Sequence, residues 1–98
     1  MLKQEITTNL GKKIDITPSG KHRILEPGAE NPGRFGEPNS SVDIYNRKGE
    51  LSTRRWYDKN GRVYRDVDMT NHGNPKNHPE YPHEHLWKFD DDGNFISR

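Results

Sequence analysis

The chain has 98 residues, of which 27% are hydrophobic, and a mean hydropathy of -1.30, so it can form one small domain with a thin core. Lysines and arginines number 16 and acidic residues 15, and the net charge of +1 excludes a global basic field that would draw the protein onto nucleic acid. The absence of cysteine excludes disulfides and thiolate metal sites, which leaves histidine and carboxylate as candidate ligands.

Residues 1–33 are weakly patterned. Apolar side chains recur there every four positions, at Leu2, Ile6, Leu10 and Ile14. This spacing suits one face of a helix, but Gly11 and the polar run 7–9 oppose a long one. The stretch 20–41 is rich in proline and glycine and predicts an extended surface segment. We therefore expect a short helix or a weakly structured arm over residues 1–33, and a single β-rich domain over residues 34–98.

Three β-prone runs follow, at 42–45, 51–57 and 63–69. Each of the two linkers between them begins with an Asx residue and has a glycine three positions later, which is typical of a hairpin loop. A fourth strand is expected over 84–89, then a turn over 90–93 with the same Asx and glycine, and a short return over 94–96. The predicted fold is α+β: a small, mostly antiparallel β-meander of three to five strands with a short N-terminal helix or a disordered arm.

Alternation along the strands assigns residues to faces. Arg55 and Tyr57 share one face of the second run, and Arg54 lies on the other. In the third run Asp66 and Asp68 share a polar face, opposite an apolar face that we expect to be the core. These two carboxylates could pair with basic side chains across the sheet.

Four of the five histidines fall within fourteen residues, at His72, His78, His83 and His85. Imidazole gains or loses charge near neutral pH and also binds transition metals, so such a cluster marks a candidate site. Acid–base catalysis, metal binding and a polar loop without chemistry are the three interpretations that the cluster leaves open.

The metal interpretation rests on two pairs of ligands. His83 and His85 would project from one face of a strand, as Asp66 and Asp68 do from theirs. If the pairs met across a sheet, they could hold a divalent ion such as zinc, manganese or magnesium, with His83 and His85 as the imidazole ligands. The spacing of the histidines matches none of the familiar zinc motifs.

The catalytic interpretation requires no cofactor. Metal-free cleavage of a phosphodiester needs a base for the ribose 2′-hydroxyl, an acid for the leaving oxygen and a cation for the charge on phosphorus. Two histidines and Arg55 can fill these roles. Guanidinium groups bind phosphates, and neighbouring aromatic rings can stack on bases. We therefore expect RNA or DNA as the partner and predict four binding residues. These are Arg54, Arg55, Tyr57 and Tyr81.

A longer pattern runs through 34–89: Gly36-Glu37-Pro38-Asn39-Ser40, Asp43, Arg55-x-Tyr57, Gly61, Asp66-x-Asp68, His72-Gly73-x-Pro75, His78-Pro79, Pro82-His83-x-His85 and Trp87. It resembles small C-terminal modules of bacterial polymorphic toxins and related phage or mobile-element proteins. These modules are predicted nucleases, often grouped with barnase/EndoU/colicin/RelE-like RNases. RNases of that group usually place a helix before a four-stranded sheet.

The resemblance implies a nuclease whose producer would need an immunity protein. It places the four clustered histidines in or near the active site, with three companions. The complete implied set is His72, His78, His83, His85, Arg55, Asp66 and Asp68.

No apolar run approaches the length of a membrane span, and the first residues lack the hydrophobic stretch of a secretory signal. We therefore expect a cytoplasmic protein with no membrane partner, unless a specialised system exports it.

Two functions follow from the sequence. The leading one is a small toxin-like nuclease that cleaves RNA, or DNA, with one of His83 and His85 as base, another histidine as acid, and Arg55 stabilising the developing negative charge. The alternative is a non-enzymatic phage or mobile-element interaction module, whose histidines shape a loop or bind a metal ion.

Overall fold

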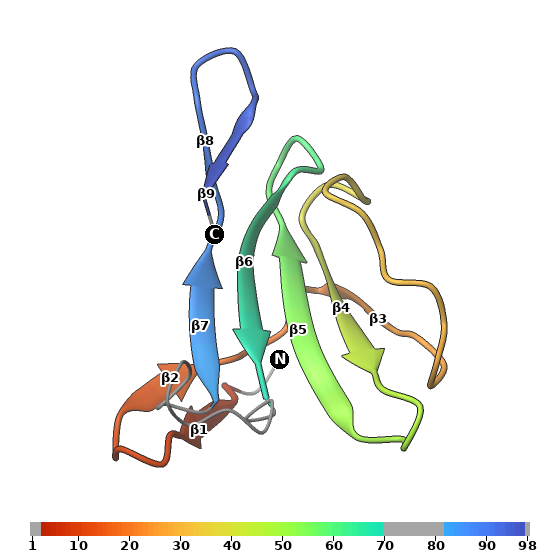
Figure 1. The fold of residues 1–98 in the computed structure, drawn as a ribbon, viewed down its shortest axis with the longest axis vertical. Helices are drawn as coiled ribbons and strands as arrows, with labels where there is room; N and C mark the ends of the chain where they lie inside the picture. The colour runs from red at the N-terminus through yellow and green to blue at the C-terminus, as the bar shows by residue number, and fades with distance from the viewer. Residues whose placement is uncertain (1–2, 70–81, 98) are drawn as a thin grey trace.

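A computed structural model describes residues 3–69 and 82–97, and the regular structure of these residues is entirely β (Figure 1). The strands are β1 (Glu5–Thr7), β2 (Lys13–Asp15), β3 (Lys21–Ile24), β4 (Ser40–Tyr45), β5 (Leu51–Tyr57), β6 (Val63–Asp68), β7 (His83–Leu86), β8 (Lys88–Phe89) and β9 (Phe95–Ser97). None of the described segments is a helix that could cross a membrane.

The expected α+β fold with an N-terminal helix or disordered arm is wrong, because strands β1 and β2 form an antiparallel hairpin instead. Ile6 pairs with Ile14 across this hairpin, and Leu10 lies in the loop with 66% of its surface exposed. Residues 6 and 14 are equally far from residue 10, so a hairpin centred there produces the same four-residue spacing as a helix. The four-residue spacing of apolar side chains therefore comes from a hairpin and not from a helix.

Four hairpin loops share one hydrogen-bond pattern. In each, a side-chain oxygen accepts the backbone amides two and four residues later, and a glycine three residues later has a φ between 76° and 86°. The loops start at Thr8, Asn46, Asp58 and Asp90. The last three confirm the turns predicted from Asx and glycine. The first escaped prediction because a threonine hydroxyl takes the place of the Asx side chain.

Five strands form the main sheet, in the order β3-β4-β5-β6-β7. The chain from β4 to β7 is antiparallel, which confirms the predicted meander, whereas β3 runs parallel to β4. The expected fourth strand is divided: β7 joins the sheet, and β8 pairs with β9 as a separate hairpin. In Figure 1 this hairpin projects past the end of the sheet.

Both faces of the sheet are buried. On one face, Trp56 and Val67 pack with Ile14 and Ile16 beneath the β1–β2 hairpin. The other face has its own cluster, Val42, Tyr57 and Val63, packed against Leu25, Trp87 and Phe89. The predicted polar face of β6 belongs to this second side, and its Asp66 is 0% exposed. A carboxylate so buried needs a cationic or hydrogen-bonding partner.

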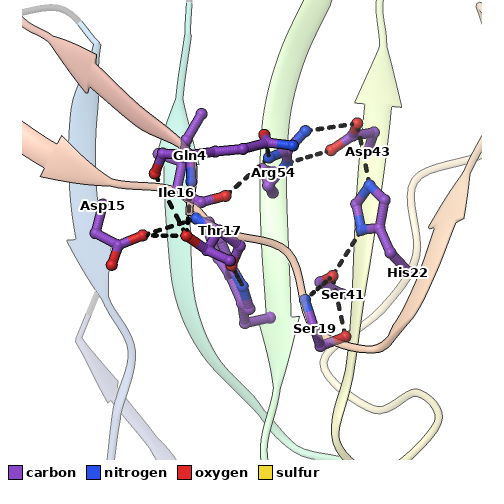
Figure 2. A network of polar contacts seen from close by, with 10 residues as sticks. Gln4, Asp15, Ile16, Thr17, Ser19, His22, Ser41, Asp43 and Arg54 are labelled. Atoms are coloured by element: carbon purple, nitrogen blue, oxygen red, sulfur yellow. Dashed lines mark hydrogen bonds and ion pairs between the residues drawn. The ribbon is translucent and has the colours of Figure 1, made fainter. Parts of the chain in front are cut away.

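Arg54 joins the β1–β2 hairpin to the sheet (Figure 2). Its Nε and Nη2 donate to the two carboxylate oxygens of Asp43 at 2.6 and 3.0 Å. Its Nη1 donates to the Ile16 carbonyl and to Gln4 Oε1, both at 2.8 Å. Because Arg54 and Asp43 are both buried, this is a desolvated ion pair, and each charge depends on the other.

The same network continues to β3 through His22 (Figure 2). Its Nδ1 lies 2.6 Å from Ser41 Oγ, and its Nε2 lies 3.1 Å from Asp43 Oδ2, within ion-pair distance but outside hydrogen-bond geometry. A serine, a histidine and an aspartate in this order resemble a hydrolytic triad. However, Ser41 is 0% exposed and its Oγ accepts the Ser19 amide at 2.9 Å, so it is shielded from substrate. The contacts hold β3 against β4.

We expect Asp43→Ala to destabilise the protein by about 3–5 kcal/mol, because it leaves the Arg54 guanidinium buried without its counter-charge. The double variant Arg54→Met with Asp43→Leu should lose much less, since no buried charge remains. Urea unfolding of the three proteins measures both losses. Equal losses for the single and double variants would contradict this account of the ion pair.

Backbone hydrogen bonding from Asn94, together with the Asn94 side chain and other turn amides, lowers the pKa of Asp90 below its usual value. A lowered folded-state pKa stabilises the protein above the unfolded pKa, and this stabilisation is lost as the pH falls through the folded pKa. The melting-temperature difference between wild type and Asp90→Ala should therefore shrink between about pH 7 and about pH 3. Asn46→Ala removes the matching acceptor, which is an uncharged side-chain amide, so its difference should change less over this pH range. If the melting-temperature difference changed with pH to the same extent in both variants, the change could not be attributed to Asp90.

Candidate active site

Strands β5, β6 and β7 bring five predicted site residues together on the face opposite the β1–β2 hairpin. Their register forms two rows of directly opposed residues, Arg55–Asp66–His85 and Thr53–Asp68–His83. Opposed residues on neighbouring strands point to the same face. The two pairs of alternating residues found in the sequence, Asp66 with Asp68 and His83 with His85, therefore meet across the sheet.

Asp68 links the second row to His85. Its Oδ1 accepts the Thr53 hydroxyl at 2.9 Å, and its Oδ2 lies 3.0 Å from His85 Nε2. Asp68 is buried, and the His85 side chain is 17% exposed. A carboxylate at Nε2 orients the ring and, when the imidazole is neutral, favours the tautomer with its proton on Nε2 and a basic Nδ1.

The two histidine rings of β7 are in contact. The centroids of His83 and His85 are 4.4 Å apart, and the ring planes meet at 79°, edge to face. Two imidazoles at this separation can address neighbouring oxygens of one bound group, one ring accepting a proton while the other donates one. The arrangement therefore suits paired acid–base chemistry.

Arg55 supplies a fixed positive charge in the first row. Its Nε and Nη2 donate to Asp66 at 2.8 and 2.9 Å, its Nη1 donates to the Pro32 carbonyl at 2.6 Å, and its guanidinium lies 5.3 Å from the centre of the Trp87 ring. Burial alone would lower the pKa of Arg55, but the hydrogen bond and charge of Asp66 outweigh burial and raise it. Three of its five N–H groups are committed to these partners.

The segment 32–36 covers the sheet beside this site. Besides Pro32, the Gly33 carbonyl accepts the Tyr57 hydroxyl at 2.8 Å, and Gly36 lies so close to the Tyr57 ring that an added Cβ would be 2.9 Å from it. Burial raises the pKa of Tyr57, against the opposing effect of Arg55, so its phenol stays neutral and donates. Tyr57 thus anchors the covering segment.

The remaining predicted site residues lie elsewhere. Arg54 is on the opposite face with Asp43, and Tyr57 is buried beneath segment 32–36. Three others, His72, His78 and Tyr81, lie outside the described residues. Within 3–69 and 82–97, no group of three or more histidine, aspartate or glutamate side chains is placed to hold a metal ion.

Two contributors were not predicted from the sequence. Thr53 hydrogen-bonds Asp68, and Pro32 receives Arg55 through its backbone carbonyl. Counting outward from the predicted 58–61 turn would not have found Thr53, because a β-bulge between Trp56 and Tyr57 shifts the register that opposes residue 53 to residue 68. The contact of Arg55 with Pro32 could not be predicted either, because every residue has a backbone carbonyl and the side-chain pattern does not show which one accepts.

No protein-family model matches this chain, and neither the curated proteins nor the solved structures contain a significant match to it. The arrangement of the described side chains is therefore the basis for any functional conclusion.

The loop at Gly61 is pressed against the covering segment. Gly61 has a φ of +76°, and an added Cβ would clash with the Gly36 carbonyl oxygen, whereas Gly49, with a φ of +80°, has open space at its Cβ position. We expect Gly49→Ala to cost about 1–2 kcal/mol for the left-handed backbone. Gly61→Ala should cost roughly 1–3 kcal/mol more, because the segment must move. Chemical denaturation of both variants tests this, and equal costs would show that the contact carries no energy.

Proposed function

We propose that the rows on β5, β6 and β7 form the catalytic centre of a small toxin-like nuclease that cleaves RNA by acid–base chemistry without a metal. The observation that carries the proposal is the Asp68–His85 pair, at 3.0 Å, with the His83 ring in contact beside it. Support also comes from the fixed charge of Arg55 on the same face and from the resemblance to polymorphic-toxin modules.

In the proposed reaction, neutral His85 takes the proton of a ribose 2′-hydroxyl through Nδ1 while Asp68 holds Nε2. The 2′-oxygen forms a bond to phosphorus, and the bond from phosphorus to the 5′-oxygen breaks. Protonated His83 gives its proton to that leaving oxygen. The products are a 2′,3′-cyclic phosphate and a 5′-hydroxyl, and the proton count balances between the two rings.

Arg55 acts in this scheme through its charge. The negative charge that develops on the phosphoryl oxygens is stabilised by a cation already held in position, so little reorganisation is needed. The salt bridge to Asp66 and the contact with Trp87 provide that rigidity. A toxic nuclease would also require an immunity protein in its producer, which the proposal includes as a partner.

We expect His85→Ala and His83→Ala each to lower the cleavage rate of RNA by about 10²- to 10⁴-fold. His83→Ala should change the melting temperature little, whereas His85→Ala should also lower it, because it removes the ion-pair partner of buried Asp68. Asp68→Asn should lower the rate as well, because the amide no longer stabilises the imidazolium. The control is His22→Asn, which removes a histidine from the opposite face. Activity is measured on purified total RNA and on single- and double-stranded DNA.

EDTA separates the interpretations. Activity that persists in EDTA and follows a bell-shaped pH profile agrees with two proton-transferring histidines. Loss of activity in EDTA would point to a divalent ion. Absence of cleavage on every substrate would favour the interaction module, in which these histidines only stabilise the fold.

A further inference from the structure

A strip of arginines and aromatic rings extends from the candidate active site along the β8–β9 hairpin. Three rings gather there: Trp87 is 6.4 Å from Phe89 and 5.2 Å from Phe95, and the last two are 6.0 Å apart. An arginine from elsewhere in the chain lies over each ring. These pairs are Arg55 over Trp87 at 5.3 Å, Arg62 over Phe89 at 4.6 Å and Arg34 over Phe95 at 4.5 Å.

The strip is continuous with the histidines. Arg55 stands at the start of the strip, and Asp66, its ion-pair partner, lies opposite His85. Trp87 follows directly after β7. In Figure 1 the β8–β9 hairpin continues beyond the end of β7. A ligand bound along the hairpin would therefore lead toward His85.

The outer part of the strip carries accessible charge. Arg34 is exposed and forms no ion pair with a carboxylate of the described residues, and the side chain of Arg62 is 35% exposed with its nearest carboxylate, Asp58, at 3.9 Å. The arginines nearer the centre of the fold are paired at much shorter distances, such as Arg54 with Asp43 at 2.6 Å. Arg34 and Arg62 therefore keep charge that a ligand can use.

An exposed ring stands beside these arginines. Phe35 forms an isolated antiparallel bridge with Arg62 and is 70% exposed. Opposed residues of such a bridge have their side chains on the same side, about 5 Å apart at Cβ. Phe35 is therefore an exposed aromatic side chain neighbouring Arg62.

We propose that the strip binds single-stranded RNA through Arg34, Phe35 and Arg62 at its outer part. The bound strand would run from these residues toward His85. Single strands are bound by arginines that contact phosphates and by aromatic faces on which bases stack. A duplex keeps its bases stacked internally and cannot use such rings. This inference rests on the proposed nuclease function for its choice of substrate, but binding can be measured without cleavage.

The test uses the full chain and a fluorescent single-stranded oligonucleotide of about ten nucleotides. Its sugars are 2′-O-methylribose, so the probe is RNA without the 2′-hydroxyl that the proposed reaction needs. Fluorescence anisotropy gives Kd for wild type and for Arg34→Gln, Phe35→Ala and Arg62→Gln. Lys48→Gln is the matched control, because it removes a charge from the β4–β5 turn at the other end of the sheet (Figure 1).

We expect Phe35→Ala to raise Kd roughly ten-fold by removing one stacking platform. Each arginine variant should raise Kd and reduce the slope of log Kd against log salt by about 0.7. Melting temperature should not change for Phe35→Ala, because this ring is exposed, and the Lys48→Gln control should bind as wild type does. A blunt-ended duplex should bind less tightly than the single strand.

The inference is overturned if the strip variants and Lys48→Gln have the same Kd, or if the duplex binds as tightly as the single strand. It is also overturned if affinity falls only in variants that unfold, since the arginines would then merely hold the hairpin. Cleavage of a dinucleotide, which is too short for the strip, reports the catalytic proposal separately. If the strip binds the oligonucleotide but no cleavage depends on the histidines, the nuclease mechanism is refuted and the binding proposal stands.

Discussion

Two successive arginines on the central strand hold this structure together. Arg54 and Arg55 point to opposite faces of β5, and each makes a two-pronged ion pair with a buried aspartate, Asp43 on β4 and Asp66 on β6. Each also donates to a backbone carbonyl of a segment that covers its face, Arg54 to Ile16 directly after β2 and Arg55 to Pro32. A slip of one residue would put both guanidinium groups on the wrong faces and leave two carboxylates buried without partners. Strand register and the position of both covering segments therefore depend on the same four charges.

The candidate active site follows from that register. Once Asp66 is opposite Arg55, the alternation of β6 places Asp68 on the same face, beside Thr53 and within reach of His85. The site thus lies on strands of the sheet, where side chains are held more rigidly than on a free loop. This arrangement buries several charged side chains, and burying a charge requires a paired counter-charge. A chain in which only 27% of residues are hydrophobic has few apolar side chains to fill a core instead.

The near-zero net charge is compatible with a nucleic-acid ligand because the arginines serve different purposes. Arg54, Arg55 and Arg65 form internal ion pairs with Asp43, Asp66 and Glu84. Arg34 and Arg62 lie at the β8–β9 hairpin with less compensation. Summing charges over the whole chain hides this local excess, and electrostatic attraction is a local property at physiological salt.

The sequence by itself determined the three hairpin turns that begin with an Asx residue and the alternation of faces, and so which residues of the candidate site share a side of their own strand. These features are decided within a few residues, by Asx and glycine in the loops and by the period of the strand. Tertiary structure alone decided that β7 pairs with β6, so that Asp68 meets His85, and that a hairpin buries Ile14 where a helix was expected. The spacing of Ile6 and Ile14 fits both forms, and only packing against Trp56 and Val67 chooses between them. Pairings between distant segments depend on burial and charge compensation over the whole sheet, which no local pattern contains.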